Sequence, residues 1–77
     1  MSRTIQDQDL QLWEVYANSG EFGSADRAKM VFQCLTEPSR RARVLHREAK
    51  KSEVEQELSR LSDTELADLL SGAEEVR

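Results

Sequence analysis

The chain has 77 residues, of which 38% are hydrophobic and 34% are charged, and its formal net charge is −4 at pH 7. This length predicts a single domain over residues 1–77, with a thin stability margin because so short a chain buries only about 60% of its unfolded surface. One cysteine and one histidine exclude an intrachain disulfide and cannot supply the four ligands of a structural zinc, so no metal and no cofactor are expected.

The N-terminal segment carries no signal that would direct the chain to a membrane. It has no apolar run of signal-peptide length, and no later stretch approaches the roughly 18 apolar residues of a membrane span. A lone cysteine without such a signal is typical of a reducing compartment, so the sequence predicts a cytoplasmic protein. We expect residues 1–5 and 73–77 to be frayed.

The first apolar segment, residues 6–17, is compatible with two structures. Its apolar residues, which include Leu12, Trp13 and Tyr16, could lie on a helix closed by Gly20 or could form a strand. Ser19–Ser24, with Gly20 and Gly23, is typical of a loop.

The middle of the chain favours helix, with a β-hairpin as the alternative. Ser24 can cap a helix with apolar residues at i, i+3, i+4 and i+7 from Ala28 to Leu35, and Pro38 suits the first turn of a second helix over residues 38–50. In the alternative, residues 30–35 and 42–46 pair around the Pro38 turn, because several of them favour strands.

The last third predicts two helices, over residues 52–61 and 63–71. Ser62 and Glu65 have the spacing of a capping box, and Ser52 with Glu55 repeats that spacing. Leucines recur at helical intervals in both segments, and Gly72 can end the second.

The preferred fold class is therefore all-α: a small bundle of four to five short helices that ends in a tight helical pair. The alternative is α+β, with three short antiparallel strands over residues 10–17, 30–36 and 41–47 packed by the two C-terminal helices. The predicted core consists of Leu12, Trp13, Tyr16, Ala28, Val31, Phe32, Leu35, Leu45, Val54, Leu58, Leu61, Leu66 and Leu69.

One charge cluster has no evident internal partner. Residues 39–51 hold six basic side chains and one acidic one in an otherwise acidic protein. On a helix, four of them would form a basic stripe on one face, namely Arg40, Arg43, Arg47 and Lys51. Such a stripe is a candidate partner-binding site, and a solvated face is its alternative interpretation.

No catalytic residue is predicted. Cys34 and His46 lack a third polar partner that would activate or orient them, and no phosphate-binding motif is present. We therefore expect no enzyme but a protein-interaction or regulatory module that uses the basic stripe. Weak, salt-dependent nucleic-acid binding through the same stripe is the alternative. The partner's identity and the choice between monomer and homodimer stay open.

Overall fold

The computed structural model describes residues 2–19, 27–47 and 49–76, and it is an α+β protein. The elements, in chain order, are β1 (Ser2–Gln6), β2 (Leu12–Asn18), β3 (Lys29–Cys34), β4 (Arg43–His46), α1 (Lys51–Arg60), α2 (Asp63–Gly72) and β5 (Glu74–Glu75). The all-α bundle of four to five helices was the wrong prediction, and so was the description of the protein as a small helical domain. The expected Ser24 cap and most of the Ser19–Ser24 loop lie outside the described residues.

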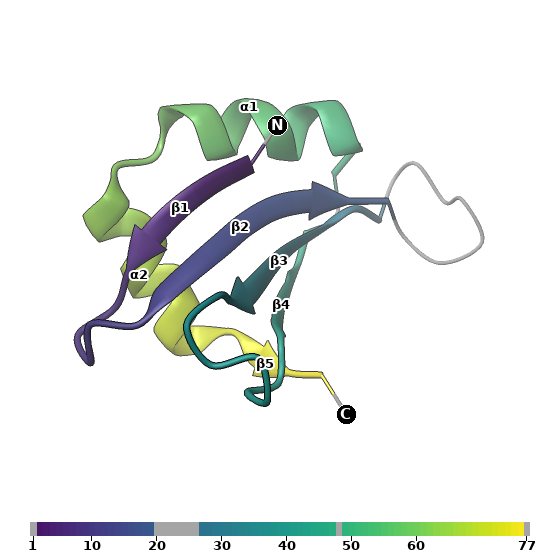
Figure 1. Cartoon of the computed structure of the whole chain (residues 1–77). Coiled ribbons are helices and arrows are strands. Elements are labelled where there is room, and N and C mark those ends of the chain that lie inside the picture. Colours follow the sequence, from purple (N-terminus) through teal and green to yellow (C-terminus); the bar gives the residue numbers. More distant parts are fainter. Residues whose placement is uncertain (1, 20–26, 48, 77) are drawn as a thin grey trace.

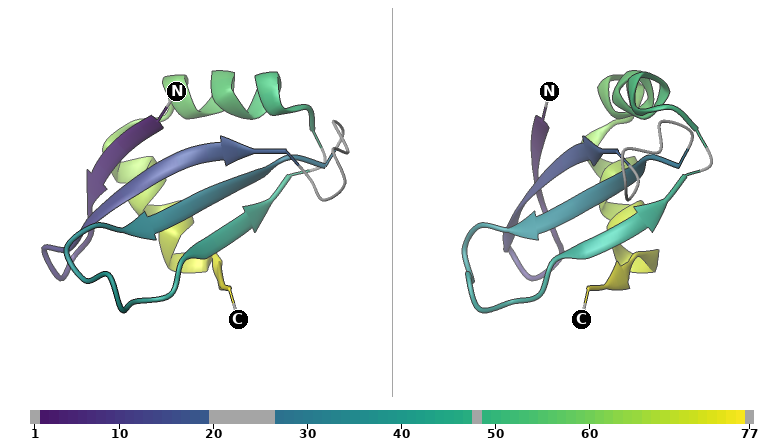
Figure 2. Two further views of the ribbon diagram at one scale, coloured as in Figure 1. Left: turned by 45° about the vertical axis from the view of Figure 1, so that its right-hand side comes forward. Right: turned by 90° about the vertical axis from the view of Figure 1, so that its right-hand side faces the viewer.

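The strands form one antiparallel sheet in the order β1-β2-β3-β4-β5 (Figure 1). Within the described chain, α1 and α2 follow β4 and lie on the same side of the sheet (Figure 2), and β5 then returns to pair with β4. α1 packs mainly on β2 and β3, whereas α2 packs on β1 and β4. The other side, away from the helices, is called the open face below.

The middle segments form strands because neighbouring strands of the sheet pair with them. β3 alternates, with Met30, Phe32 and Cys34 directed to the helices and Val31 to the open face. The helical spacing from Ala28 to Leu35 therefore counted residues from both faces as one helical face. In β4, Arg43–His46 pair with β3 on one side and partly with β5 on the other. These ladders outweigh the helix propensity of the Arg- and Ala-rich segment, since tertiary context commonly overrides such small preferences.

The alternative α+β architecture anticipated only part of the sheet. Its three strands, over residues 10–17, 30–36 and 41–47, overlap β2, β3 and β4. The sheet has two more strands, β1 and β5, at its edges. β5, and β1 except for Gln6, fall in the terminal segments for which fraying was predicted, and β1 pairs with β2 over its whole length, from Ser2↔Tyr16 to Gln6↔Leu12.

The core lies between the sheet and the helices. Its fully buried large side chains include Trp13 from β2, Phe32 from β3, Leu58 from α1 and Leu66 from α2. Fully burying one such side chain contributes about 1.5–3 kcal/mol, so this layer supplies the main driving force for folding. The described buried cluster comprises Ile5, Trp13, Val15, Ala17, Ala28, Met30, Phe32, Cys34, Val54, Leu58, Leu66 and Leu70.

The predicted core was wrong where strands replaced helices. Leu12 and Leu35 are exposed, and Tyr16 and Val31 belong to the open face rather than to the core cluster. In α2 the buried leucines are Leu66 and Leu70, whereas Leu69 is only partly buried against the core.

The two C-terminal helices are confirmed, but the tight pair was a wrong prediction, because α1 packs mainly on β2 and β3 and α2 on β1 and β4. Ser62 Oγ accepts a hydrogen bond from the Glu65 amide at 3.1 Å, and the Glu65 carboxylate accepts one from the Ser62 amide at 3.0 Å, which completes the predicted capping box. The box predicted at Ser52 was wrong, because α1 already begins at Lys51 and its cap, Lys50, makes no side-chain capping bond. No helix in the described part of the chain is long and apolar enough to cross a bilayer.

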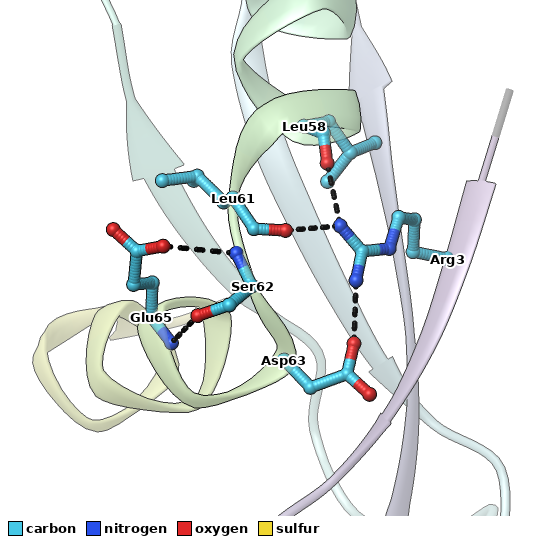
Figure 3. A network of polar contacts seen from close by, with 6 residues as sticks. All are labelled: Arg3, Leu58, Leu61, Ser62, Asp63 and Glu65. Atoms are coloured by element: carbon cyan, nitrogen blue, oxygen red, sulfur yellow. Dashed lines mark hydrogen bonds and ion pairs between the residues drawn. The ribbon is translucent and has the colours of Figure 1, made fainter.

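Arg3 fastens the edge strand to the joint between the helices (Figure 3). Its guanidinium donates to the backbone carbonyl of Leu58 at 2.9 Å and to that of Leu61, and it pairs with the Asp63 carboxylate. The last carbonyls of a helix lack partners within the helix, so a cation at this position stabilises the C-terminus of α1.

Candidate functional site

The four residues of the predicted basic stripe do not share a helix. Arg40 lies in the connection between β3 and β4, Arg43 opens β4, Arg47 follows β4, and Lys51 is the first residue of α1. The spacing that aligned them assumed a helix over residues 38–50, and that helix does not form. Their common surface therefore has to be assessed from their contacts.

Two of these arginines flank the single tryptophan. The guanidinium carbons of Arg40 and Arg43 lie 5.3 Å and 5.7 Å from the centre of the Trp13 ring, within the range of a cation–π contact. Arg43 also donates to the Leu70 carbonyl at 3.2 Å and lies 3.9 Å from the Glu75 carboxylate. Arg43 thus links β4 to α2 and to β5.

The other two cations face acidic side chains of α1. Arg47 pairs with Glu57 at 3.1 Å, and Lys51 lies 4.0 Å from Glu55 one turn along the helix. Partly exposed pairs of this kind contribute only about 0–1 kcal/mol, so a partner could exchange them at little cost. Of the four cations, Arg40 alone has no carboxylate within 4.0 Å in the described ranges.

A pocket of about 200 Å³ opens beside Trp13, between the β1–β2 turn and α2. The Asp7 carboxylate at its edge accepts hydrogen bonds from the Trp13 indole N–H at 2.7 Å and from the amides of Asp9 and Gln11 at 2.9 Å each. Partial burial by itself raises the pKa of Asp7, but these hydrogen bonds and the nearby Arg40 outweigh it and hold the pKa below its usual value. Asp7 is therefore a charged anchor of the turn, and its lone pairs are largely used within the chain.

Cys34 and His46 do not meet. Cys34 is buried on the helical side of the sheet, with its Sγ 3.7 Å from Thr36 Oγ1 and 3.9 Å from Gln11 Oε1. His46 is exposed and pairs with Lys29, so it belongs to the open face. The described residues contain no group of three or more metal-ligating side chains.

The open face carries a line of apolar side chains across its middle. Tyr16, Val31 and Val44 are successive cross-strand partners on β2, β3 and β4, and we call them the apolar row. Val31 is 6% exposed and its two neighbours are half-buried, although Val31 does not belong to the core cluster under the helices. Side chains directly opposite on neighbouring strands stand about 4.5–5.5 Å apart, so the three form one continuous surface.

Further apolar side chains extend the open face at the end where β2 begins. Leu12 is 38% exposed and Leu35 is 49% exposed, and the Leu35 amide donates to the Leu12 carbonyl at 2.8 Å, which places them side by side. Val76, 42% exposed, donates its amide to the Ala42 carbonyl at 2.8 Å and so continues the pairing of β5 with β4. Isolated exposed leucines are normal on proteins, but several on one face make that face a candidate interaction surface.

Sequence reasoning missed this surface because it assigned the same residues to a helical core. The signal was nevertheless present in β2, where residues 12–17 place apolar side chains at both odd and even positions. A strand with that pattern has two apolar faces, and the helices can cover only one of them.

Comparisons with known proteins add no assignment: no family model, no curated protein and no solved structure matches the chain.

Proposed function

We propose that this protein is a non-catalytic module that binds a second protein chain, and that it does so through the open face of its sheet. The observation that carries the proposal is the apolar row of Tyr16, Val31 and Val44, extended by the exposed Leu12 and Leu35 on a face opposite the helices. An antiparallel sheet whose second face is only solvated usually alternates cleanly with polar residues there, and this face does not.

The basic residues take a secondary role in the proposal. Arg43, Arg47 and Lys51 lie within 4.0 Å of carboxylates of the same chain, which lowers their attraction for a partner. Arg40, which forms none of these ion pairs, is the stripe residue best able to contact an acidic group at the rim of an interface. We do not extend the proposal to nucleic acid, because three of the four cations of the predicted stripe already lie near carboxylates of the same chain.

Two further points belong to the same proposal. The module needs no catalytic group, in keeping with the separation of Cys34 and His46 on opposite faces of the sheet. We also propose a cytoplasmic location, because a single buried thiol suits a reducing compartment. Recovery of a tagged chain in the extracellular fraction would contradict that location.

A pull-down with two matched variants tests the proposed surface. The first variant, Leu12→Gln with Leu35→Gln, makes the exposed end of the open face polar. The second, Arg40→Ala with Lys51→Ala, removes two cations but leaves the contact of Arg43 with Leu70 in place. We expect the leucine variant to lose the proteins that the wild type captures and the second variant to keep them.

The opposite pattern would transfer the binding site to the basic residues. A leucine variant that captures the same proteins as the wild type would contradict the proposal. Trp13 fluorescence of each variant shows whether it is folded, since the ring is 1% exposed in the native protein.

A further inference from the structure

Two opposite charges lie on either side of the apolar row. Glu14 precedes Tyr16 by two residues on β2, and Lys29 precedes Val31 by two residues on β3. Because β2 and β3 are antiparallel and Tyr16 pairs with Val31, Glu14 and Lys29 lie on opposite sides of the row. Both belong to the open face, since the residues that follow them, Val15 and Met30, are buried under the helices.

These charges are not paired with each other. Glu14 lies opposite Gln33, and Lys29 lies opposite Asn18 and His46. The ion pairs found in the described part of the chain include neither Glu14 nor Lys29. Both side chains are half-buried by their neighbours, so pairing them would require little further ordering.

The arrangement is self-complementary for Glu14 and Lys29, whereas Glu74, the exposed partner of Val44 at the β5 end of the row, would lie near its own copy across the axis. Two sheets that pack face to face lie about 10 Å apart, with their strands within about 30° of each other. A two-fold axis in the plane between them, close to the direction of the apolar row, places the row of one copy against that of the other. The same axis brings Glu14 of each copy opposite Lys29 of the other, so the symmetric contact contains this ion pair twice.

We propose that the occupant of the open face is a second copy of this chain, bound face to face about that two-fold axis. The inference rests on the proposed function, because it names the partner of the same surface. A domain of this length gains from association, since its own core leaves a thin stability margin.

The size of the face sets the expected strength. The five strands have five, seven, six, four and two residues, and at about 3.3 Å per residue and about 4.8 Å between strands they give a face of roughly 400 Å². Two such faces bury about 800 Å², less than a standard specific interface, so we expect weak association with a dissociation constant on the order of 100 µM.

Sedimentation measurements over a wide concentration range test the dimer with charge swaps. We expect the mass-average mass of the wild type to rise from about 1.15 to about 1.85 times the monomer mass between about 10 µM and about 2 mM chain. Glu14→Lys and Lys29→Glu each place like charges opposite one another twice, and each should weaken association at least about tenfold. The double variant, Glu14→Lys with Lys29→Glu, recreates both pairs and should restore dimerisation.

Asp68→Lys is the matched control, because it makes the same change in charge at an exposed position of α2 on the helical side. It should dimerise like the wild type. Single swaps that leave the wild-type mass curve unchanged, or a double variant that fails to recover although its circular dichroism is native, would overturn the proposed interface.

A wild type that remains monomeric at every concentration would also overturn the second copy as occupant. That result would leave the proposed function intact if the Leu12 and Leu35 variant still loses captured proteins, because the partner would then be a different protein. If that variant loses nothing, the proposed function fails as well.

Discussion

Arg3, on the edge strand β1, holds the joint between α1 and α2, although that joint lies far from it in the sequence. Its planar guanidinium addresses two backbone carbonyls of the α1 C-terminus and the Asp63 carboxylate at the start of α2. The side chain is 26% exposed, so its hydrogen bonds are partly shielded from water. Hydrogen bonds to a charged group contribute about 1.5–3 kcal/mol when they are shielded in this way.

We predict that Arg3→Met lowers the free energy of unfolding by about 1–3 kcal/mol. Methionine keeps the length and the aliphatic packing but leaves the Leu58 and Leu61 carbonyls without this donor. Arg3→Lys should fall between the two, because an ammonium cannot reach three oxygens in one plane. Urea denaturation followed by Trp13 fluorescence measures the change, and equal midpoints for Arg3→Met and wild type would contradict it.

Leu10 is the second residue whose backbone invites a test. It has φ of 65° in the β1–β2 turn, a left-handed conformation that glycine adopts freely, and its side chain is 73% exposed. The turn is held by the hydrogen bond from the Leu10 backbone amide to the Asp7 carbonyl at 3.1 Å, to which the Leu10 side chain contributes nothing. The side chain therefore adds strain without burial.

Leu10→Gly should stabilise the fold by about 0.5–1 kcal/mol, which corresponds to a Tm about 2–8 °C higher in a domain of this size. Leu10→Ala is its control, because alanine removes the exposed side chain and keeps the unfavourable conformation. Calorimetry should place the melting temperature of the glycine variant above that of the alanine variant. The reverse order would show that the Leu10 side chain, and not its backbone, decides stability here.

The elements differ in how locally their sequences encode them. α2 was predictable because its signal lies within four residues, in the reciprocal bonds of Ser62 and Glu65. β1 was not, because Ile5 is its only buried residue and its remaining support comes from pairing with β2 and from the contacts of Arg3 with the joint between the helices. β4 likewise depends on pairing with β5, because Glu75 of β5, the partner of Arg43, lies far from it in the sequence. The capping signal thus identified α2, whereas helical spacing alone also predicted a helix where β3 forms, and the sheet needed contacts that spacing does not contain.

Only part of the candidate site could likewise be predicted from the sequence. The basic cluster was visible as composition, but its alignment assumed the helix over residues 38–50 that β4 replaces. Arg43 donates a hydrogen bond to the Leu70 carbonyl, and only the folded chain brings these two residues together. The open face needed the knowledge that Tyr16 pairs with Val31, and pairing register is set by the whole sheet.

At the level of α2, the capping box predicts a response to acid. The Ser62 backbone amide and its side chain hold the pKa of Glu65 below the usual 4.5. A carboxyl with a lowered folded pKa contributes stability that is present above its unfolded pKa and is lost as the pH falls through the folded pKa. The window of this loss therefore lies below about pH 4.5.

Glu65→Gln isolates that contribution, because glutamine can complete the same box without titrating. We expect urea midpoints of wild type and Glu65→Gln to be similar at neutral pH, and the wild type to lose more stability as the pH falls below about 4.5. Asp7, whose pKa is also lowered, is common to both proteins and cancels in the difference. Parallel curves would mean that the Glu65 charge does not support α2.

At the scale of the whole molecule, folding and association are linked if two copies share the open face. Any partner that binds only the native chain raises the apparent stability by mass action. For a homodimer above its dissociation constant, a tenfold rise in concentration stabilises each chain by about 0.7 kcal/mol, half of the value for a tenfold change in a simple equilibrium. In a domain of this size, that corresponds to a Tm about 3–6 °C higher.

We therefore predict a melting temperature that is constant in dilute solution and rises by about 3–6 °C per tenfold in concentration above roughly 100 µM. Glu14→Lys should melt at one temperature over the same range, and the double variant with Lys29→Glu should regain the slope. Asp68→Lys should keep it, which separates the interface from a general effect of charge. A slope equally present in Glu14→Lys would show that aggregation, and not the open face, couples concentration to stability, because aggregation does not depend on pairing Glu14 with Lys29.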